Sequence, residues 1–341
     1  MTATAEVERS EGALGVVVIG RNEGERLMRC IESAQATPHV LVYVDSGSTD
    51  GSAERVRGLG HTVVELDMSL PFCAARARNE GFRALLRLSP GLRFAQFVDG
   101  DCELRSDWLA VARARLEEVP DLAIVCGRRR EREPERSLYN RLCDIEWDTP
   151  VGWTSACGGD FLVRAAAFEQ VGGFDDTVVA GEEPELCHRL IEKGYRIERL
   201  DREMTLHDAA MYRFSQWWRR AARAGYAFAL VAWLHRRSDR RPWARQVISI
   251  LAWSGFGVVI SALALAWDVR FALGLFAYPL LALKIYRSLR RHRGLPAADA
   301  RAYAVACVIG KFAELQGVLR AVRDLLFRRS RTIMEYKLPA Q

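Results

Sequence analysis

Short apolar, β-branched runs alternate with helical stretches through the first part of the chain. The apolar runs, which predict strands, cover residues 13–20, 40–44, 61–66, 94–98 and 122–126. Helices are expected between them, over residues 23–34, 50–57, 73–87 and 106–118. Because unbroken apolar runs are typical of strands buried on both faces, the pattern predicts an α/β domain with a doubly wound, mostly parallel sheet flanked by helices. Ligands bind beyond the carboxyl ends of the strands in such sheets, so the residues after each strand are the first candidates for chemistry.

Two longer apolar runs follow in the last third of the chain. Residues 247–267 contain no charged side chain, and at about 1.5 Å per residue a helix of this length reaches roughly 30 Å, the thickness of a bilayer core. The second run, 271–283, is short for a span and extends to residue 286 only if Lys284 and Tyr286 reach the membrane interface. We therefore expect a membrane helical hairpin with apolar spans at about 247–267 and 271–286.

An amphipathic helix is expected after the hairpin, over about residues 301–327. Apolar residues recur there at alternating steps of three and four from Val305 to Leu326, and charged residues occupy the other faces. Two interpretations are open for this helix. It packs on the globular domain, or it lies on the surface of an anionic membrane.

Charge follows the same division of the chain. Residues 1–230 carry 30 of the 49 basic and 37 of the 43 acidic side chains, whereas residues 231–341 carry 19 basic and only 6 acidic ones. Basic clusters flank both outer ends of the hairpin, so the positive-inside rule places both ends on the cytoplasmic side. Since these blocks border apolar spans, nucleic acid is not an expected partner. The expected organisation is a tail over 1–12, a globular domain over 13–230 and a membrane-associated helical region over 231–341.

The cysteines and the start of the chain favour a cytoplasmic domain. The eight cysteines lie far apart, without a C-x-x-C pair, and are expected to be reduced core thiols. Residues 1–12 are polar and acidic and lack an apolar segment, so no secretory signal peptide is expected.

Acidic residues stand directly after two of the predicted strands. Asp45 opens the sequence DSGSTDGS, where a carboxylate suits hydrogen bonding to a base or a sugar; the alternative is an ordinary capped turn. Asp99 and Asp101 follow the fourth strand. One of them can reach a ribose while the other binds a divalent cation that bridges a diphosphate.

Several motifs occur in order over residues 13–228, and together they resemble glycosyltransferase family 2. They are VIGRNE at 18–23, the DSGSTDGS loop at 45–52, ARNEG at 77–81, DGD at 99–101, and VGGFD at 171–175 followed by GEEPEL at 181–186. The resemblance implies the GT-A fold and transfer of a sugar from a nucleotide diphosphate sugar, usually with inversion at the anomeric carbon.

The resemblance also implies donor-binding residues. Asp45 would contact the nucleotide base and Asp99 its ribose. Arg78, or Arg76 two residues before it, would lie near the base or the diphosphate, where a guanidinium fits phosphate oxygens. The alternative for both arginines is a solvated helix face.

A metal site is implied as well. Asp101 would bind a divalent cation, Mn²⁺ or Mg²⁺. His207 lies beyond a strand expected at 196–200, where the family often places a histidine that completes the metal site. The alternative for His207 is a structural role.

The catalytic base is expected within residues 181–185. Glu183 stands where the family usually has the aspartate of a Glu-Asp pair, and because its side chain is one methylene longer, Glu182 remains a candidate too. An inverting transfer needs a carboxylate that accepts the proton of the acceptor hydroxyl. The alternative is that these glutamates form the acidic first turn of a helix that runs to about Lys193.

The segment WTSACGGD would lie at the acceptor side, which assigns Trp153, Gly158, Gly159 and Asp160 to it. Trp153 either stacks on a sugar or fills the core. The sequence FSQWWRR at 214–220 differs in residue order from the Q-x-x-R-W motif of processive members, which argues against a processive synthase.

Taken as a whole, the sequence predicts a metal-dependent, hexosyltransferase-like enzyme at the cytoplasmic membrane, with its catalytic domain on the cytoplasmic side. It would move a sugar to a hydroxyl of a lipid-linked or other membrane-proximal saccharide acceptor, in polysaccharide or glycolipid biosynthesis. Membrane lipid is an expected partner. Two alternatives are a transferase acting on a soluble acceptor and a catalytically silent, sugar-nucleotide-binding subunit of a membrane complex.

Overall fold

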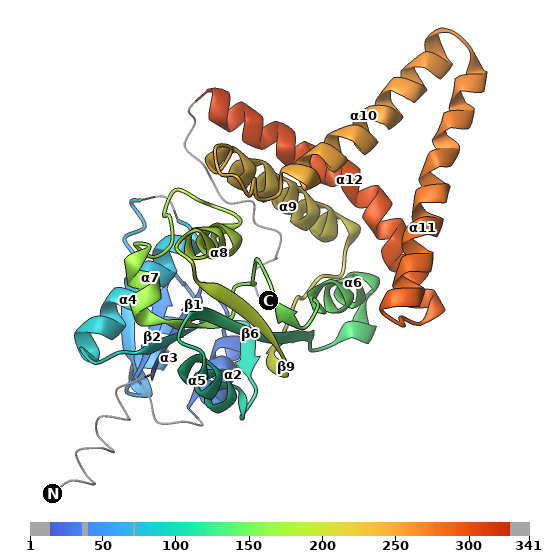
Figure 1. Cartoon of the computed structure of the whole chain (residues 1–341). Coiled ribbons are helices and arrows are strands. Elements are labelled where there is room, and N and C mark those ends of the chain that lie inside the picture. Colours follow the sequence, from blue (N-terminus) through green and yellow to red (C-terminus); the bar gives the residue numbers. More distant parts are fainter. Residues whose placement is uncertain (1–13, 36–39, 71, 328–341) are drawn as a thin grey trace, which may run out of the picture.

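The computed structural model describes residues 14–35, 40–70 and 72–327. These residues form a globular domain built on a sheet, from which a group of long helices projects (Figure 1). The tail expected over residues 1–12 lies outside the described residues. The inference that this segment contains no signal peptide therefore stays a prediction from the sequence.

One mixed sheet forms the centre of the globular domain. Its strands are β1 (Leu14–Gly20), β2 (Val40–Asp45), β3 (Thr62–Glu65), β4 (Phe94–Asp99), β5 (Cys102–Leu104), β6 (Leu122–Glu131), β7 (Gly152–Trp153), β8 (Phe161–Arg164) and β9 (Arg196–His207). Their order is β3-β2-β1-β4-β8-β6-β9-β5, and β7 pairs with β9. The contacts β1·β2, β1·β4, β2·β3 and β6·β9 are parallel. Ile19 pairs with Asp99 and Gly20 with Asp45, so the ends of three strands meet at one edge.

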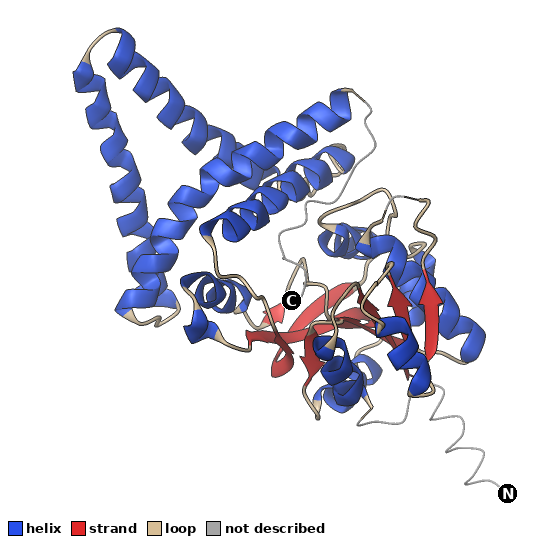
Figure 2. Ribbon diagram, turned by 180° about the vertical axis from the view of Figure 1, so that it is seen from behind, coloured by secondary structure: helices blue, strands red, loops and turns tan. Residues whose placement is uncertain are grey.

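Helices pack against both faces of this sheet (Figure 2). They are α2 (Glu25–Ala34), α3 (Ser52–Gly58), α4 (Ala74–Leu88), α5 (Trp108–Glu118), α6 (Leu138–Trp147), α7 (Ala165–Gln170) and α8 (Glu182–Glu192), with a short 3-10 turn, η1 (Pro134–Arg136). The central residues of β1, Val16 to Val18, are fully buried, as expected for an unbroken apolar run covered from both sides. The predicted doubly wound α/β arrangement is therefore confirmed.

The structure corrects the strand pattern in two ways. β5, β7 and β8 were not expected, and β8 runs antiparallel between β4 and β6. β6 continues to Glu131 instead of ending at residue 126, and β9 continues to His207 instead of residue 200. The charged extensions of these strands pair with each other, for example through Arg130 Nη1 and Glu203 Oε1, 3.1 Å apart.

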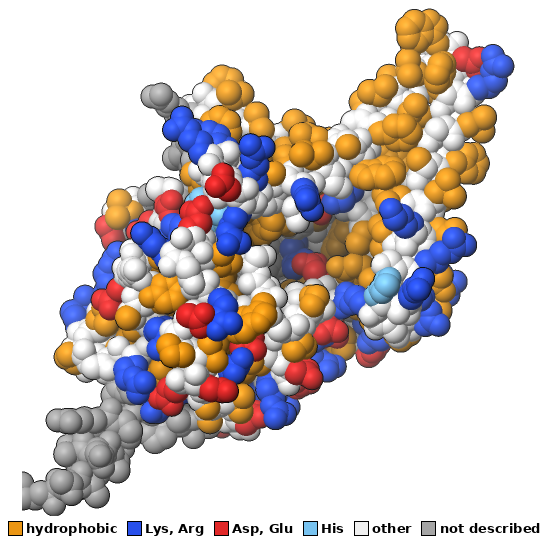
Figure 3. Space-filling model, in the orientation of Figure 1, with side chains coloured by type: hydrophobic (Ala, Val, Ile, Leu, Met, Phe, Trp, Pro, Cys, Tyr) orange, Lys and Arg blue, Asp and Glu red, His pale blue; other side chains and the backbone are white. Residues whose placement is uncertain are grey.

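The C-terminal region consists of α9 (Phe214–Leu234), α10 (Ala244–Ala266), η2 (Val269–Phe276), α11 (Ala277–His292) and α12 (Ala297–Leu326). Three segments are long and apolar enough to cross a membrane by length and composition: α10, residues 269–292, and α12. α10 and α11 project as an arm away from the sheet (Figure 1). Hydrophobic side chains gather along this arm (Figure 3), and Leu265 and Trp267 near its tip are 90% and 81% exposed. Such an apolar surface is typical of a membrane or partner contact.

The amphipathic helix predicted over 301–327 corresponds to α12, which begins earlier, at Ala297, and packs along α9. A Cβ atom built on Gly317 would lie 1.9 Å from the carbonyl oxygen of Ala222, and one built on Gly225 would lie 2.0 Å from that of Glu314. The indole nitrogen of Trp218 donates a hydrogen bond to Gln316 Oε1 over 2.7 Å. The two helices thus touch backbone to backbone, which supports the interpretation of α12 as a packed helix.

Replacing Gly317 by alanine is expected to destabilise this crossing by about 1–3 kcal/mol, because the new methyl group must push the two backbones apart. Gly310→Ala in the same helix is the matched control. Its Cβ would meet no atom closer than 3.8 Å, so it gains roughly 0.5–1 kcal/mol of helix propensity without a clash. Thermal unfolding of the full chain in detergent measures both. Equal melting temperatures for the two variants would contradict the close crossing.

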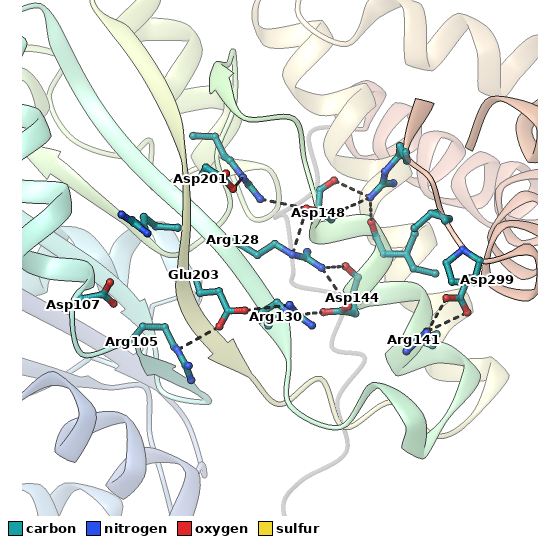
Figure 4. Close-up of a pocket in the computed structure, with 16 residues that line it drawn as sticks. Arg105, Asp107, Arg128, Arg130, Arg141, Asp144, Asp148, Asp201, Glu203 and Asp299 are labelled. Carbon is teal, nitrogen blue, oxygen red and sulfur yellow. Dashed lines mark hydrogen bonds and ion pairs between the residues drawn. The ribbon is translucent and has the colours of Figure 1, made fainter. Parts of the chain in front are cut away.

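A cavity of about 750 Å³ between β6, β9, α6 and the start of α12 is lined mainly by charged side chains (Figure 4). Arg141 on α6 donates to Asp299 on α12 over 2.8 and 3.2 Å. Arg293 donates to the carbonyl oxygens of Ile145 and Asp148 over 2.7 and 2.9 Å. Because these ion pairs and hydrogen bonds join the helical region to the globular domain, we interpret this cavity as a structural junction.

Candidate active site

A second cavity, of about 530 Å³, opens at the carboxyl ends of β1 and β4. It is lined by residues from the sheet, from α4, from the start of α8 and from α9. The lining residues whose side chains could bind a ligand or take part in a reaction are Arg78, Asp99, Asp101, Glu182, Glu183, His207 and Arg223. The cavity lies where a doubly wound sheet binds its ligands.

Arg78 on α4 is the hub of this cavity. Its Nη2 donates to Asp99 Oδ1 over 2.8 Å and its Nη1 to Glu182 Oε1 over 3.0 Å, while Glu183 Oε1 lies 3.2 Å from Nη1. The Arg78 side chain is only 2% exposed, and a buried cation needs such partners to offset its lost hydration. Burial alone would lower the pKa of Arg78, but the three carboxylates outweigh it and raise the pKa above its usual value, so the side chain stays charged. One side chain therefore ties the end of β4 to the start of α8.

Glu183 has the electrostatic surroundings of a general base. Burial, followed by the negative charge of Glu182, raises the pKa of Glu183 to about 7, and Arg78 acts in the opposite direction. A carboxylate with a pKa near the working pH takes up a proton most effectively. The Glu183 side chain is also more exposed than that of Glu182, at 15% against 3%. Glu183 is thus the more accessible of the two carboxylates.

Asp101 and His207 lie next to each other. Asp101 stands between β4 and β5, and His207 is the last residue of β9. His207 Nε2 lies 3.5 Å from Asp101 Oδ1, and both side chains are nearly buried. Burial, helped by the charge of Arg129, lowers the pKa of His207 well below its usual value, so the imidazole is neutral and keeps a lone pair. Its Nδ1 is buried without a hydrogen bond. A neutral imidazole and a carboxylate at this separation fit a divalent cation.

The loop before β8 brings backbone into direct contact with the hub. A Cβ atom on Gly159 would lie 2.6 Å from Arg78 Nη2, 2.9 Å from Asp99 Oδ2 and 3.2 Å from Glu183 Oε1. Any side chain at this position would enter the ion pairs, so the close approach requires glycine. Asp160 next to it is fully buried and accepts hydrogen bonds from the Asp99 amide and the Thr205 hydroxyl, over 3.2 and 2.7 Å. Asp160 therefore holds the end of β4 in place.

Arg129 on β6 is a site residue that the sequence interpretation missed. Its Nη2 lies 2.8 Å from Asp160 Oδ2 and 3.7 Å from Asp99 Oδ2. The guanidinium also stacks over the ring of Trp147 at 5.6 Å. One signal in the sequence could have identified it. Successive side chains of a strand point to opposite faces of a sheet, so in a strand the middle arginine of RRR at 128–130 faces the opposite side from its two neighbours.

Five of the predicted site residues do not line the cavity: Asp45, Arg76, Trp153, Gly158 and Asp160. Asp45 accepts hydrogen bonds from the Tyr43 hydroxyl and from the amides of residues 47 and 48, and so holds its own loop. Arg76 donates to the carbonyl oxygen of Asp67 over 2.9 Å. Trp153 is 55% exposed on β7 with Arg196 stacked on its ring, and its acceptor-side role stays a prediction. Gly158 is exposed beside Gly159, which does line the cavity.

Two family models match the chain. Glycosyl transferase family 2 matches residues 15–162, and glycosyl transferase family group 2 matches residues 150–286. The chain belongs to glycosyltransferase family 2. The resemblance carried by the sequence motifs is thereby confirmed.

Solved structures extend the comparison for this glycosyltransferase. Mannosyltransferase PcManGT from Pyrobaculum calidifontis, in complex with GDP-Man and Mn²⁺, superposes with a TM-score of 0.60 at 20% identity, over 90% of this chain and 86% of that one. This likeness confirms the GT-A fold. Glucosyl-3-phosphoglycerate synthase from Mycobacterium tuberculosis, in complex with Mn²⁺, UDP and glucosyl-3-phosphoglycerate, matches with a TM-score of 0.44 at 15% identity, over 66% of this chain and 80% of that one.

A curated relative is the pre-mycofactocin glycosyltransferase of Mycobacterium tuberculosis (strain CDC 1551 / Oshkosh). It is 27% identical over 205 residues, which cover 57% of this chain and 42% of the relative. The glycosyltransferase described here thus matches less than half the length of that protein.

Proposed function

We propose that this glycosyltransferase moves a sugar from a nucleotide diphosphate sugar to a hydroxyl group of a lipid-linked or other membrane-proximal acceptor. The observation that carries the proposal is the link through Arg78 between Asp99, at the donor edge of the sheet, and Glu183, at the start of α8. Both reacting partners can therefore meet in one cavity.

Each residue of the cavity has a part in the proposed reaction. Glu183 accepts the proton of the acceptor hydroxyl as its oxygen attacks the anomeric carbon. The bond from that carbon to the diphosphate breaks, and the nucleoside diphosphate leaves with the electron pair, which inverts the anomeric centre in a single displacement. Arg78 keeps Glu183 and the donor-binding Asp99 in register.

A divalent cation belongs to the proposal. Asp101 and His207 would hold it, and it would offset the charge that develops on the leaving diphosphate. The structural neighbour PcManGT was solved with GDP-Man and Mn²⁺, which supports a metal of this kind. Mn²⁺ and Mg²⁺ both suit a site of oxygen ligands with one imidazole.

The acceptor would reach the cavity from the side of the apolar helices. α9 lines one wall of the cavity through Arg220 and Arg223, and its other side packs against α12. Because α10 and the following segment, residues 269–292, are long and apolar enough to enter a bilayer, an acceptor anchored there is held near Glu183 at a raised effective concentration. We accordingly propose a cytoplasmic-membrane location with the catalytic domain on the cytoplasmic side.

The experiment that tests this function uses the full chain purified in detergent. UDP-, GDP- and dTDP-sugars are added with and without Mn²⁺, and the melting temperature is measured, since a ligand of the folded state must raise it. A Mn²⁺-dependent rise with one nucleotide supports the donor site, and transfer of the matching radiolabelled sugar into an organic-phase lipid fraction supports the acceptor class. No rise with any donor would overturn the proposal. Transfer to water-soluble acceptors alone would overturn the lipid-linked acceptor.

Arg223→Gln is expected to raise the acceptor KM by roughly tenfold or more, while the donor-induced melting shift stays unchanged. Arg223 lines the cavity, and its guanidinium makes no ion pair or hydrogen bond with another residue in the described part of the chain, so its charge is available for an anionic group of the acceptor. A hydrogen bond to a charged group contributes about 1.5–3 kcal/mol. Arg219→Gln, an exposed neighbour on α9, is the matched control. Equal KM values for the two variants would remove Arg223 from acceptor binding.

A further inference from the structure

A cluster of histidines and glutamates lies at the far end of α8, outside the cavity described above. His188 and Glu192 stand one helical turn apart on α8, and His235 directly follows α9. His188 Nε2 is 3.2 Å from Glu192 Oε1, and the ring centroids of the two histidines are 4.3 Å apart. One ligand atom from each of the three residues lies within 4.8 Å of the other two.

The burial of His188 points to a ligand at this place. Its side chain is only 5% exposed, and its Nε2 is buried without a hydrogen bond of good geometry. An unsatisfied buried nitrogen is costly in a folded protein and calls for a partner. Glu192 on the same site is 42% exposed, so an ion can reach the cluster from solvent.

His235 is already held in the manner of a metal-bound imidazole. Its Nε2 lies 3.0 Å from Oε1 of Glu185, whose side chain is 3% exposed. A carboxylate bonded to one ring nitrogen fixes the orientation of the imidazole and leaves the other nitrogen for a metal. Glu185 is in turn bound by Arg189 over 2.7–3.0 Å, which holds it in place.

We propose that His188, Glu192 and one ring nitrogen of His235 form a second metal site, which binds Zn²⁺. Two imidazoles and one carboxylate are a donor set that Zn²⁺ takes, with water in the fourth position. Zinc bonds of about 2.0–2.2 Å place neighbouring ligand atoms of a tetrahedral site about 3.3 Å apart. The 3.2 Å between His188 Nε2 and Glu192 Oε1 already matches that spacing. The paired imidazoles also distinguish this site from the Asp101–His207 pair, whose single imidazole beside a carboxylate suits Mn²⁺ or Mg²⁺ as well.

The bound ion would fasten two parts of the molecule together. α8 begins with Glu182 and Glu183 and ends at Glu192, while His235 stands where the chain leaves α9 for the apolar helix α10. A metal that bridges these points therefore positions the helix that carries the proposed base relative to the helical region. It is a positioning site, and no substrate atom is bound to it.

The test measures zinc binding rather than turnover. Full-length protein is stripped with a chelator in detergent and titrated with Zn²⁺ in the presence of excess Mg²⁺, and bound zinc is counted by mass spectrometry. We expect the wild type to bind one equivalent of Zn²⁺ at this site, and Asp101→Asn to bind the same equivalent. His188→Gln, His235→Gln and Glu192→Gln should each weaken zinc binding at least tenfold. The zinc-induced rise in melting temperature should disappear in the same three variants.

The matched control is His61→Gln, which removes an imidazole that pairs with Gln35 elsewhere in the globular domain and should leave zinc binding unchanged. Glu192 is exposed enough that its amide variant folds even if loss of a buried histidine does not. Zinc bound as tightly by Glu192→Gln as by the wild type would overturn the site. An equivalent that is lost with Asp101→Asn would also overturn it, because the zinc would then sit in the active-site cavity.

Discussion

Glu183→Gln is expected to lower kcat by about 10²–10⁴-fold while the donor still raises the melting temperature as in the wild type. The amide keeps the size of the side chain and an oxygen for Arg78, which lies 3.2 Å away, but it cannot accept the acceptor proton. Transfer of radiolabelled sugar under saturating donor and acceptor measures the change. Turnover within a few fold of the wild type would remove Glu183 from the role of base.

The pH profile separates Glu183 from its neighbour. Because burial and the charge of Glu182 raise the pKa of Glu183 to about 7, the base is protonated and inactive at lower pH. We therefore expect kcat/KM of the wild type to rise with pH through about 7 and then level off. Glu182→Gln removes the neighbouring negative charge, so the rise should move to lower pH while the enzyme remains active. A loss of activity in Glu182→Gln as large as that in Glu183→Gln would instead identify Glu182 as the base.

The sheet and its functional edge could be predicted because local sequence decides them. An unbroken, β-branched apolar run such as the one ending at Gly20 is typical of a strand covered on both faces, and parallel strands bring their carboxyl ends to one side. The motifs then supplied the identities of Asp99, Asp101, Glu183 and His207. The structure brings these four into one cavity, although their individual roles remain proposals.

The missed features depend on partners far away in sequence. Arg129 lies in a run of arginines that reads as a solvated segment, and its role appears only when β8 brings Asp160 within 2.8 Å. β6 continues through that run because its polar residues pair with those of β9, so charge alone did not end the strand. The close packing of α12 on α9 likewise depends on Gly225 and Gly317 meeting at one point. Propensity and periodicity describe one segment at a time and contain no such pairings.

Asp45 shows a different limit. The motif assigns its carboxylate to a base, and this assignment stays a prediction. The structure adds that the carboxylate accepts three hydrogen bonds, from the Tyr43 hydroxyl and from two amides of the following turn, and that Ser46, the next residue, lines the cavity. A motif gives the position of a site, whereas the structure shows which neighbours each of its atoms contacts.

Asp101→Asn is expected to reduce the rate of sugar transfer on the order of 10³-fold. A metal that offsets the charge on the leaving diphosphate lowers the activation free energy by several kcal/mol. Each loss of about 1.36 kcal/mol slows the reaction tenfold. The amide is a weaker ligand than the carboxylate 3.5 Å from His207 Nε2. The Mn²⁺-dependent part of the donor-induced melting shift should disappear as well, which a purely structural defect would not select. Asp107→Asn, an exposed acid at the start of α5, is the matched control and should behave as the wild type. A variant that keeps both the Mn²⁺ dependence and the rate would show that the cation binds without Asp101, and the metal site would then have to be sought among the other carboxylates of the cavity.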